Sequence, residues 1–424
     1  MIVNRTIIES SITGDKIVKL KHSSGLDIYV CEMEGFSTTE ALFGTKYGSI
    51  NTTFKTKADK DFVTVPEGIA HFLEHKLFEN KDTDVFELYA KTGASANAFT
   101  SFDKTCYMFS CSENYEQSLR ILLSFVQEPY FTQQSVDKEQ GIIGQEIKMC
   151  DDNPSWRVFF NMLNGMYYNH PVKIDIAGTI DSISKIDAPL LYRCYNTFYN
   201  LHNMVLSIAG NVKEQEVIKI ADELLKPCES LELQTICPDE PDTIVKNEIV
   251  QHLPVGLPLF NLGFKSKAEV GYANLKAEME AFIMANTLAD VSSPLYEGLL
   301  NDGLINSEFG VEVFNGDGFF SIIFGGESSD PREVKRRIFK AIQDAKTNGL
   351  DKSCFEMIKK ANYGSFIREL NDVSTMANSI INAHLSGVEP LQSIDVLSKV
   401  SYDDAMNCLL TRLDLDKSVL SIIE

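Results

Sequence analysis

The sequence predicts an α+β protein of two related domains, each a mostly antiparallel sheet with helices packed on one face. The chain has 424 residues, which is more than one ordinary domain holds. Segments with the polarity pattern of strands are mixed with helical segments, without the strict alternation of a doubly wound fold. The order of these segments in the first half of the chain recurs in the second half, which favours an internal duplication.

The elements expected in the first half follow from polarity patterns and turn residues. Two segments with strand-like alternation flank Ser23-Ser24-Gly25, a turn signal, and therefore predict a hairpin. Pro66 and Gly68 mark the start of a segment with helical spacing. The predicted strands are 16–22, 26–31, 41–50 and 105–111, with an extended segment at 93–100, and the predicted helices are 68–79, 85–92, 115–127 and 135–150.

Residues 226–243 have the composition of a linker between the two domains. They contain three prolines and five acidic residues, which argues against a packed element. We therefore expect a first domain over 1–228, a linker over 229–243 and a second, related domain over 244–424. The second domain should repeat the first with a strand at 259–264, a helix at 275–290, strands at 309–315 and 318–324, and a helix at 331–348.

Charge and cysteine content limit the function classes. A formal net charge of -21 repels phosphate backbones, so nucleic acid is not an expected partner, and the simplest interpretation is that the charge keeps the protein soluble. The nine cysteines are scattered without a Cys-x-x-Cys pair, as in a protein with reduced thiols. The N-terminal residues lack a signal-peptide pattern and no apolar run is long enough to span a membrane, so we expect a cytoplasmic protein.

The segment His71-Phe72-Leu73-Glu74-His75 carries the sharpest chemical signal, in a chain with seven histidines. On a helix, His71 and His75 are four residues apart and share one face, so both imidazoles can bind one metal ion. Glu74 shares that face and suits a general base that removes a proton from an attacking water. The alternative is a pair of structural histidines on an amphipathic helix, but this spacing is the signature of inverzincin metallopeptidases.

A catalytic zinc needs a third protein ligand and an open position. Glu139 and Glu146 lie seven residues apart in the helix predicted at 135–150, two turns apart on one face. One of these carboxylates is the expected third ligand, and the other could orient a ligating histidine. Without the histidine motif upstream, a solvated acidic stripe would be the simpler explanation for both.

Three motifs occur in order in the first half of the chain. They are Gly-Ile-Ala-His-Phe-Leu-Glu-His at 68–75, Gly-Ala-Ser-Ala-Asn-Ala-Phe-Thr-Ser at 93–101, and the paired glutamates. Together they resemble the insulinase/pitrilysin-type peptidases, which include the mitochondrial processing peptidases and bacterial two-subunit relatives. The resemblance implies one zinc ion (Zn²⁺) per chain, bound by His71, His75 and Glu146, with Glu139 as a supporting carboxylate and Glu74 activating the water.

The same resemblance implies a substrate-binding strand. Ser95, Ala96, Asn97, Ala98 and Phe99 would form an exposed edge strand with which a peptide substrate pairs through its main chain. Asn97 and the backbone of Ala98 would help hold the scissile bond near the metal. The alternative is a plain buried strand, whose small residues allow close approach of another backbone.

The second half departs from the family pattern. Active members usually carry an Arg that binds the substrate chain and a Tyr that stabilises the developing oxyanion. Here Pro294 and Asn306 occupy those positions, and Tyr296 is out of frame. The resemblance therefore favours a heterodimer in which a partner subunit of similar fold, lacking zinc ligands, supplies the Arg and Tyr. A homodimer that is weakly active or uses other residues is the second option.

The expected function is that of a zinc-dependent endopeptidase subunit that hydrolyses peptides or small unfolded proteins. Two alternatives stay open. Some family members are structural subunits that have lost catalysis, although these usually lose a histidine or the base, and here all three residues are present. The chain could also be the maturation protease for one specific modified peptide, on which the sequence is silent.

Overall fold

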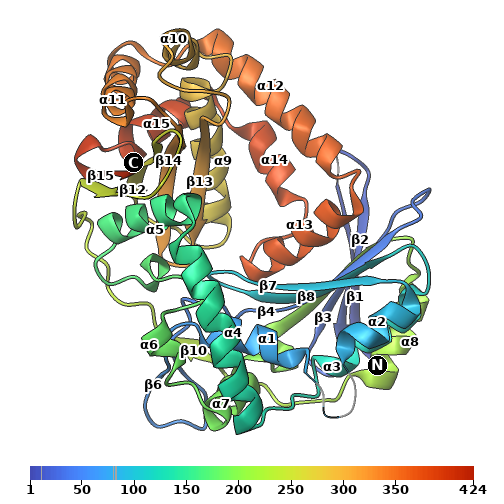
Figure 1. The fold of residues 1–424 in the computed structure, drawn as a ribbon. Helices are drawn as coiled ribbons and strands as arrows, with labels where there is room; N and C mark the ends of the chain where they lie inside the picture. Colours follow the sequence, from blue (N-terminus) through green and yellow to red (C-terminus); the bar gives the residue numbers. More distant parts are fainter. Residues whose placement is uncertain (11, 80, 82–83) are drawn as a thin grey trace. The chain divides into compact units, whose positions relative to one another are not determined.

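The computed structural model describes residues 1–10, 12–79, 81 and 84–424 (Figure 1). The chain divides into two compact units, and each unit contains a segment from the opposite half of the chain. Unit 1 comprises Met1–Ile147, Asp175–Ile236 and Ile367–Gln392, and unit 2 comprises Lys148–Ile174, Cys237–Phe366 and Ser393–Glu424. The mixture of helices with largely antiparallel sheets confirms the predicted α+β class.

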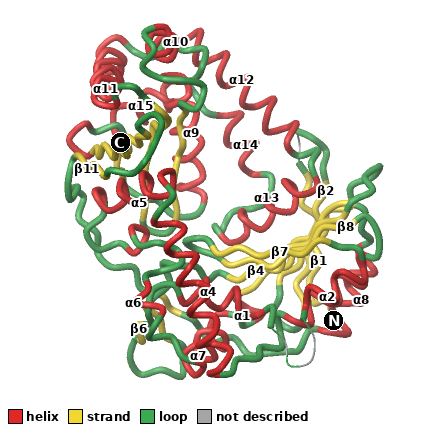
Figure 2. The backbone as a smooth tube through the Cα atoms, viewed as in Figure 1, coloured by secondary structure: helices red, strands yellow, loops and turns green. Residues whose placement is uncertain are grey.

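Unit 1 is built on a largely antiparallel sheet, part of which is visible in Figure 2. Among the described residues, seven strands lie in the order β1-β2-β3-β9-β4-β8-β7, and only β3 and β9 run parallel. Their bounds are β1 (Ile2–Glu9), β2 (Lys16–His22), β3 (Asp27–Glu32), β4 (Thr39–Thr45), β7 (Ser95–Thr100), β8 (Thr105–Cys111) and β9 (Met204–Gly210). The short strands β5 (Thr53–Lys55), β6 (Val63–Thr64) and β10 (Gln234–Thr235) form a separate small sheet.

The strand predicted at 41–50 is wrong at its C-terminal end, because β4 ends at Thr45. The backbone N–H of Tyr47 donates to the carbonyl of Thr45 at 2.8 Å, so the chain turns out of the sheet there. Gly48 follows this turn, and a Cβ atom at Gly48 would collide with the backbone of Phe102 and Asp103. The glycine therefore lets the loop between β7 and β8 close against residues 48–50.

Both faces of the unit 1 sheet are covered, and β9 shows how. Leu206 and Ile208 point into the larger core, whereas Val205 and Ala209 point into a second core shared with α13. Burial on both faces explains why the sequence of β9 is almost uninterruptedly apolar. The helices that begin in unit 1 are α1 (Ile69–Leu77), α2 (Val85–Thr92), α3 (Tyr115–Phe125), α4 (Gln133–Asp151), α6 (Ile180–Ile183), α7 (Ala188–Phe198), α8 (Glu214–Leu224) and α13 (Val373–Leu385).

Unit 2 is built on a smaller sheet of the same kind. In the part of the chain that the structure describes, its five strands have the order β11-β15-β12-β14-β13, and only β11 and β15 are parallel. The strands are β11 (Glu248–Gln251), β12 (Leu259–Ser266), β13 (Gly310–Gly316), β14 (Phe319–Glu327) and β15 (Ser418–Ile423). The helices are α5 (Pro154–Met166), α9 (Tyr272–Ala289), α10 (Pro294–Asn301), α11 (Pro331–Asn348), α12 (Lys352–Glu369), α14 (Gln392–Lys399) and α15 (Tyr402–Arg412). Among all helices of the described residues, none is long and apolar enough to cross a membrane.

The two sheets repeat one arrangement of strands. The order β3-β9-β4-β8-β7 matches β11-β15-β12-β14-β13, with a parallel first pair and antiparallel pairs after it. The covering helices are exchanged between the halves of the chain. In unit 1, α13 packs on β9 and β4, and in unit 2, α5 packs on β15 and β12. The second half of the chain thus supplies α13 to the sheet of unit 1, and the first half supplies α5 to the sheet of unit 2.

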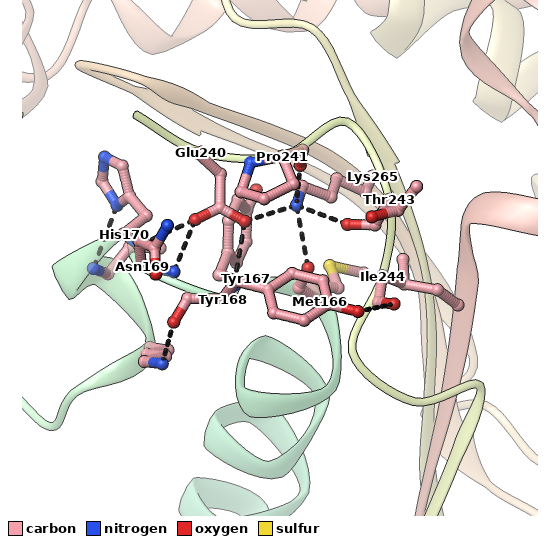
Figure 3. A network of polar contacts seen from close by, with 12 residues as sticks. Met166, Tyr167, Tyr168, Asn169, His170, Glu240, Pro241, Thr243, Ile244 and Lys265 are labelled. Carbon is pink, nitrogen blue, oxygen red and sulfur yellow. Dashed lines mark hydrogen bonds and ion pairs between the residues drawn. The ribbon is translucent and has the colours of Figure 1, made fainter. Parts of the chain in front are cut away.

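Part of the segment expected to be a linker is anchored within unit 2 by an ion pair with the buried Lys265 (Figure 3). Lys265, on β12, is 4% exposed, and its Nζ atom lies 2.6 Å from the carboxylate of Glu240. The Glu240 carboxylate also accepts hydrogen bonds from backbone N–H groups after α5, and Lys265 also donates to backbone carbonyls. These partners are Tyr168, Asn169 and His170 for Glu240, and Met166, Pro241 and Thr243 for Lys265.

Replacing Lys265 with Met should destabilise the protein strongly, because it leaves the largely enclosed Glu240 carboxylate without its cation. Loss of one partner of a buried ion pair typically costs about 3–5 kcal/mol. The same substitution at Lys267, an exposed residue two positions along the chain, should change the free energy of unfolding by less than about 0.5 kcal/mol. Urea denaturation followed by circular dichroism measures both, and equal stability of the two variants would show that the buried pair contributes nothing.

Candidate metal centre

Helix α1 carries the histidine motif, and its N-cap residue is Gly68. Both the backbone conformation and the close neighbours of Gly68 require a glycine at this position. Gly68 caps the helix with φ +86°, a left-handed conformation that side chains rarely adopt. A Cβ atom at this position would also collide with the carbonyl oxygen of Ala177. Phe72 and Leu73 anchor the helix in the unit 1 core. The start and the rotation of α1 are therefore both fixed.

Helix α4 brings Glu146 opposite the two histidines of α1. The Nε2 atom of His71 lies 3.5 Å from Glu146 Oε1, and the Nε2 atom of His75 lies 3.5 Å from Glu146 Oε2. Donor atoms bound tetrahedrally to one zinc ion, each at about 2.0–2.1 Å, lie about 3.3 Å from one another. Each histidine nitrogen thus lies near this ligand-to-ligand distance from one oxygen of Glu146, and imidazole and carboxylate are groups that zinc binds.

Glu74 also lies close to both histidines, with potential ligand atoms of the three residues within 4.8 Å of one another. It differs from Glu146 in its contacts, because its Oε2 atom accepts a hydrogen bond of 3.2 Å from the hydroxyl of Thr100. Burial raises the pKa of the Glu74 carboxyl. Glu74 and Glu146 thus both lie close to the histidines, and they differ in that the hydroxyl of Thr100 holds one oxygen of Glu74.

Glu139 holds the ring of His75 from the side away from Glu146. Its Oε1 atom lies 3.0 Å from His75 Nδ1, and the residue is 6% exposed. Burial alone would raise the pKa of Glu139, but the hydrogen bond with His75 lowers it below its ordinary value. A neutral His75 that donates from Nδ1 to this carboxylate leaves the lone pair of Nε2 directed at Glu146, which is the tautomer that binds a metal.

His71 lies deeper, at 8% exposure. Burial, assisted by the neighbouring His75, lowers the pKa of His71 to about 3. The imidazole is therefore neutral at neutral pH, the form in which histidine binds a metal. Among the described residues, none forms a hydrogen bond with His71 Nδ1.

The substrate-binding residues expected from the resemblance lie on β7. In the described part of the chain, β7 pairs with β8 on one side and has no strand on the other. Ser95 and Asn97 are exposed, whereas Ala96 and Ala98 face the unit 1 core, and Phe99 packs toward the core shared with α13. Asn97 Oδ1 accepts a hydrogen bond of 2.9 Å from the backbone N–H of the next residue. The open edge of β7 is thus partly covered by one of its own side chains.

The residues that depart from the family pattern lie in unit 2. Pro294 is the first residue of α10, and the side-chain amide of Asn306 donates to the carboxylate of Glu327 at 2.6 Å. Tyr296, 7% exposed, lies in the unit 2 core, where its ring packs against Phe309. None of the three presents a cation or an exposed phenol.

Two models of protein families match this chain. The family model described as Insulinase (Peptidase family M16) matches residues 65–180, and the one described as Peptidase M16 inactive domain matches residues 185–362. The uncharacterized zinc protease YmfH of Bacillus subtilis (strain 168) is 39% identical over 402 residues, covering 94% of this chain and 94% of that protein. This chain belongs to the insulinase family of peptidases. Its match to the insulinase model spans the histidine motif and both glutamates of α4.

Two further similarities extend this result. The crystal structure of an M16-like peptidase from Alicyclobacillus acidocaldarius superposes with a TM-score of 0.94 at 31% identity, and the match covers 98% of this chain and 99% of that one. The mitochondrial-processing peptidase subunit beta of Caenorhabditis elegans is 30% identical over 161 residues, 37% of this chain and 35% of that protein. The insulinase family and its zinc proteases support a metallopeptidase role for this chain.

Replacing Gly68 with Ala should disturb the site through the backbone alone. Gly35 offers a matched control, because its φ of +84° is nearly the same but nothing lies within 4 Å of its Cβ position. At Gly35 we expect a loss of about 1–2 kcal/mol from the left-handed conformation. At Gly68 the collision with Ala177 adds to this, so we expect about 3 kcal/mol and a lower zinc content. Urea denaturation and elemental analysis measure both, and equal effects at the two glycines would contradict the proposed constraint.

Proposed function

We propose that this chain is the zinc-holding subunit of an endopeptidase that cleaves peptides and small unfolded proteins. The observation that carries the proposal is the placement of the Glu146 carboxylate 3.5 Å from Nε2 of both His71 and His75, with Glu74 beside them. Two imidazoles and one carboxylate, with an adjacent base, form a set of residues that can support zinc-dependent hydrolysis of peptide bonds.

Each residue has a distinct task in the proposed reaction. Zinc held by His71, His75 and Glu146 would polarise the scissile carbonyl and make water more acidic. Glu74 accepts the proton of the attacking water and passes it to the nitrogen of the leaving amine, so that the C–N bond breaks with no net gain or loss of protons. Glu139 keeps the ring of His75 in its binding orientation.

The peptide is proposed to bind as an added strand along the open edge of β7. Edge pairing reads the main chain, so an extended peptide of varied sequence would fit. The backbone N–H of Ala98 is held by Asn97 Oδ1, so the Asn97 side chain has to move aside before a substrate carbonyl can take that donor. Asn97 can then bind the substrate itself, together with the exposed Ser95.

A partner subunit is proposed to complete the active site. In unit 2, Pro294 and Asn306 occupy the positions at which active members of the family usually have the Arg and the Tyr. The side chain of Tyr296 is packed in the unit 2 core. We therefore propose a heterodimer with a subunit of similar fold that supplies these two side chains. A homodimer, a structural subunit and a protease for one specific peptide are the competing hypotheses.

The heterodimer is tested by measuring hydrolysis of a quenched fluorescent peptide by this chain, by a related chain carrying the Arg and Tyr, and by both together. We expect zinc in this chain alone and turnover only in the mixture. Glu74→Gln should keep zinc and assembly but reduce kcat by about 100-fold or more, since a general base contributes on that scale. Full activity of this chain alone would refute the heterodimer, and absence of zinc would refute the enzyme hypothesis.

Replacing Glu139 with Ala should weaken zinc binding without unfolding the protein. The change removes the acceptor that orients His75 Nδ1, and loss of such a supporting group typically lowers metal affinity about 10–100-fold. Competition with a fluorescent zinc chelator measures the affinity. Glu87→Ala, an exposed position on α2, is the control. Unchanged affinity in Glu139→Ala would remove Glu139 from the proposed site.

A further inference from the structure

The carboxylate of Glu74 has one side-chain partner whose role the reaction outlined above does not use. The hydroxyl of Thr100 donates to Glu74 Oε2 at 3.2 Å. Among the described residues, no other side chain donates a hydrogen bond to this carboxylate. The hydroxyls of Tyr107 and Tyr199 are bonded to each other at 2.9 Å, and in the described structure neither forms a hydrogen bond with Glu74. Thr100 is therefore the group that can fix the orientation of the Glu74 carboxylate.

The alternation of β7 explains why Thr100 reaches α1. Residues two apart on a strand share a face, so Thr100 points to the same side as Ala96 and Ala98. Both alanines pack against the core that contains α1, and α1 and β7 are in contact. The small alanine side chains let the helix approach the strand, and the first polar side chain on this face meets Glu74.

The position of the Thr100 hydroxyl is set by the sheet and not by the helix. Thr100 pairs directly with Thr105 across the β7–β8 hairpin, and their hydroxyl oxygens lie 3.4 Å apart. Thr105 is buried, and its hydroxyl donates to the carbonyl of Tyr47 at 2.8 Å. Cross-strand threonine pairs of this kind stabilise a sheet. The Thr100 side chain thus packs against a cross-strand neighbour that is itself buried and hydrogen-bonded.

The loop that follows Thr100 is also held firmly. Ser101 donates its N–H to the carbonyl of Lys104 at 2.8 Å, which closes the hairpin. The carbonyls of Ser101 and Phe102 accept hydrogen bonds of 3.0 Å from the N–H groups of Ser49 and Ile50. The hairpin end cannot shift without breaking these bonds, so Thr100 is a fixed reference point for the side chain of Glu74.

We propose that Thr100 is a positioning residue for the general base, an inference that rests on the proposed role of Glu74. A glutamate side chain has three rotatable bonds, and general-base catalysis needs its free oxygen within hydrogen-bond reach of the water. The Thr100 hydroxyl holds Oε2, which leaves Oε1 to accept the proton. Enzymes commonly restrict a catalytic side chain by hydrogen-bonding it to a second side chain that is itself held rigidly.

The test compares Thr100→Val with Thr100→Ser in the active enzyme, together with any subunit that activity requires. Valine has the shape of threonine without the hydroxyl, and serine keeps the hydroxyl. We expect Thr100→Val to lower kcat about 10–100-fold, as loss of a supporting group does, with unchanged KM, zinc content and thermal stability. Thr100→Ser should restore most of kcat. Thr64→Val removes the exposed hydroxyl that is bonded to Thr53, and should leave kcat unchanged.

A double variant separates this role from a structural one. If Thr100 acts through Glu74, Thr100→Val should lower the residual rate of Glu74→Gln no further, because residues that act as a unit are not additive. Wild-type kcat in Thr100→Val, or a raised KM or lost zinc with unchanged kcat, would overturn the proposal while leaving the peptidase function intact. A fully active Glu74→Gln variant would instead overturn the proposed function, because Glu74 would then not be the base.

Discussion

The approach of α4 to α1 places three carboxylates beside two imidazoles, and this concentration of donors governs the chemistry of the site. Burial raises the pKa of Glu74 and of Glu146, and neighbouring carboxylates add to the rise at Glu146. Packing like charges into a partly buried space is unfavourable unless a cation offsets them. A divalent ion between the imidazoles and Glu146 would remove this penalty, so metal binding and the packing of α4 on α1 should support each other.

The surroundings of these residues come from elements far apart in the sequence. Gly68 lets α1 start against residues 177–178, the β7–β8 hairpin supplies the hydroxyl of Thr100, and α4 supplies both glutamates. The opposite face of the same sheet is covered by α13, which comes from the second half of the chain. Because each half contributes a helix to the other unit, neither half of the sequence can complete its fold alone. In the shared strand order, β9 and β4 correspond to β15 and β12, so α13 and α5 cover equivalent strands of the two sheets.

The sequence predicted much of the fold where polarity patterns are unambiguous. Helices α2 and α11 and strand β8 have the predicted bounds. The central strands β9 and β15 carry no such signal, because burial on both faces removes the alternation that identifies a strand. The exchange of α5 and α13 cannot be read from local patterns, since it depends on contacts between distant segments.

In the candidate site too, the sequence predicts which residues share a face of one helix, but not which helices come together. The spacing of His71 and His75 predicts a shared helix face, and the spacing of Glu139 and Glu146 predicts a second. The structure brings these faces together and gives each glutamate a different histidine atom to contact. The sequence does not predict Thr100 as a site residue, because only the packing of β7 on α1 brings its hydroxyl to Glu74. Its position two residues after Ala98 was the one available signal.

Anomalous diffraction at the zinc absorption edge, from crystals of the zinc-loaded protein, tests the proposed ligands most directly. We expect one strong peak per chain, with His71 Nε2, His75 Nε2 and a carboxylate oxygen of Glu146 each at about 2.0–2.2 Å. In the same map, Glu139 should contact His75 Nδ1, and Glu74 should lie outside the ligand set. A peak elsewhere, or one bound by Glu74 in place of Glu146, would contradict the assignment of ligand and base.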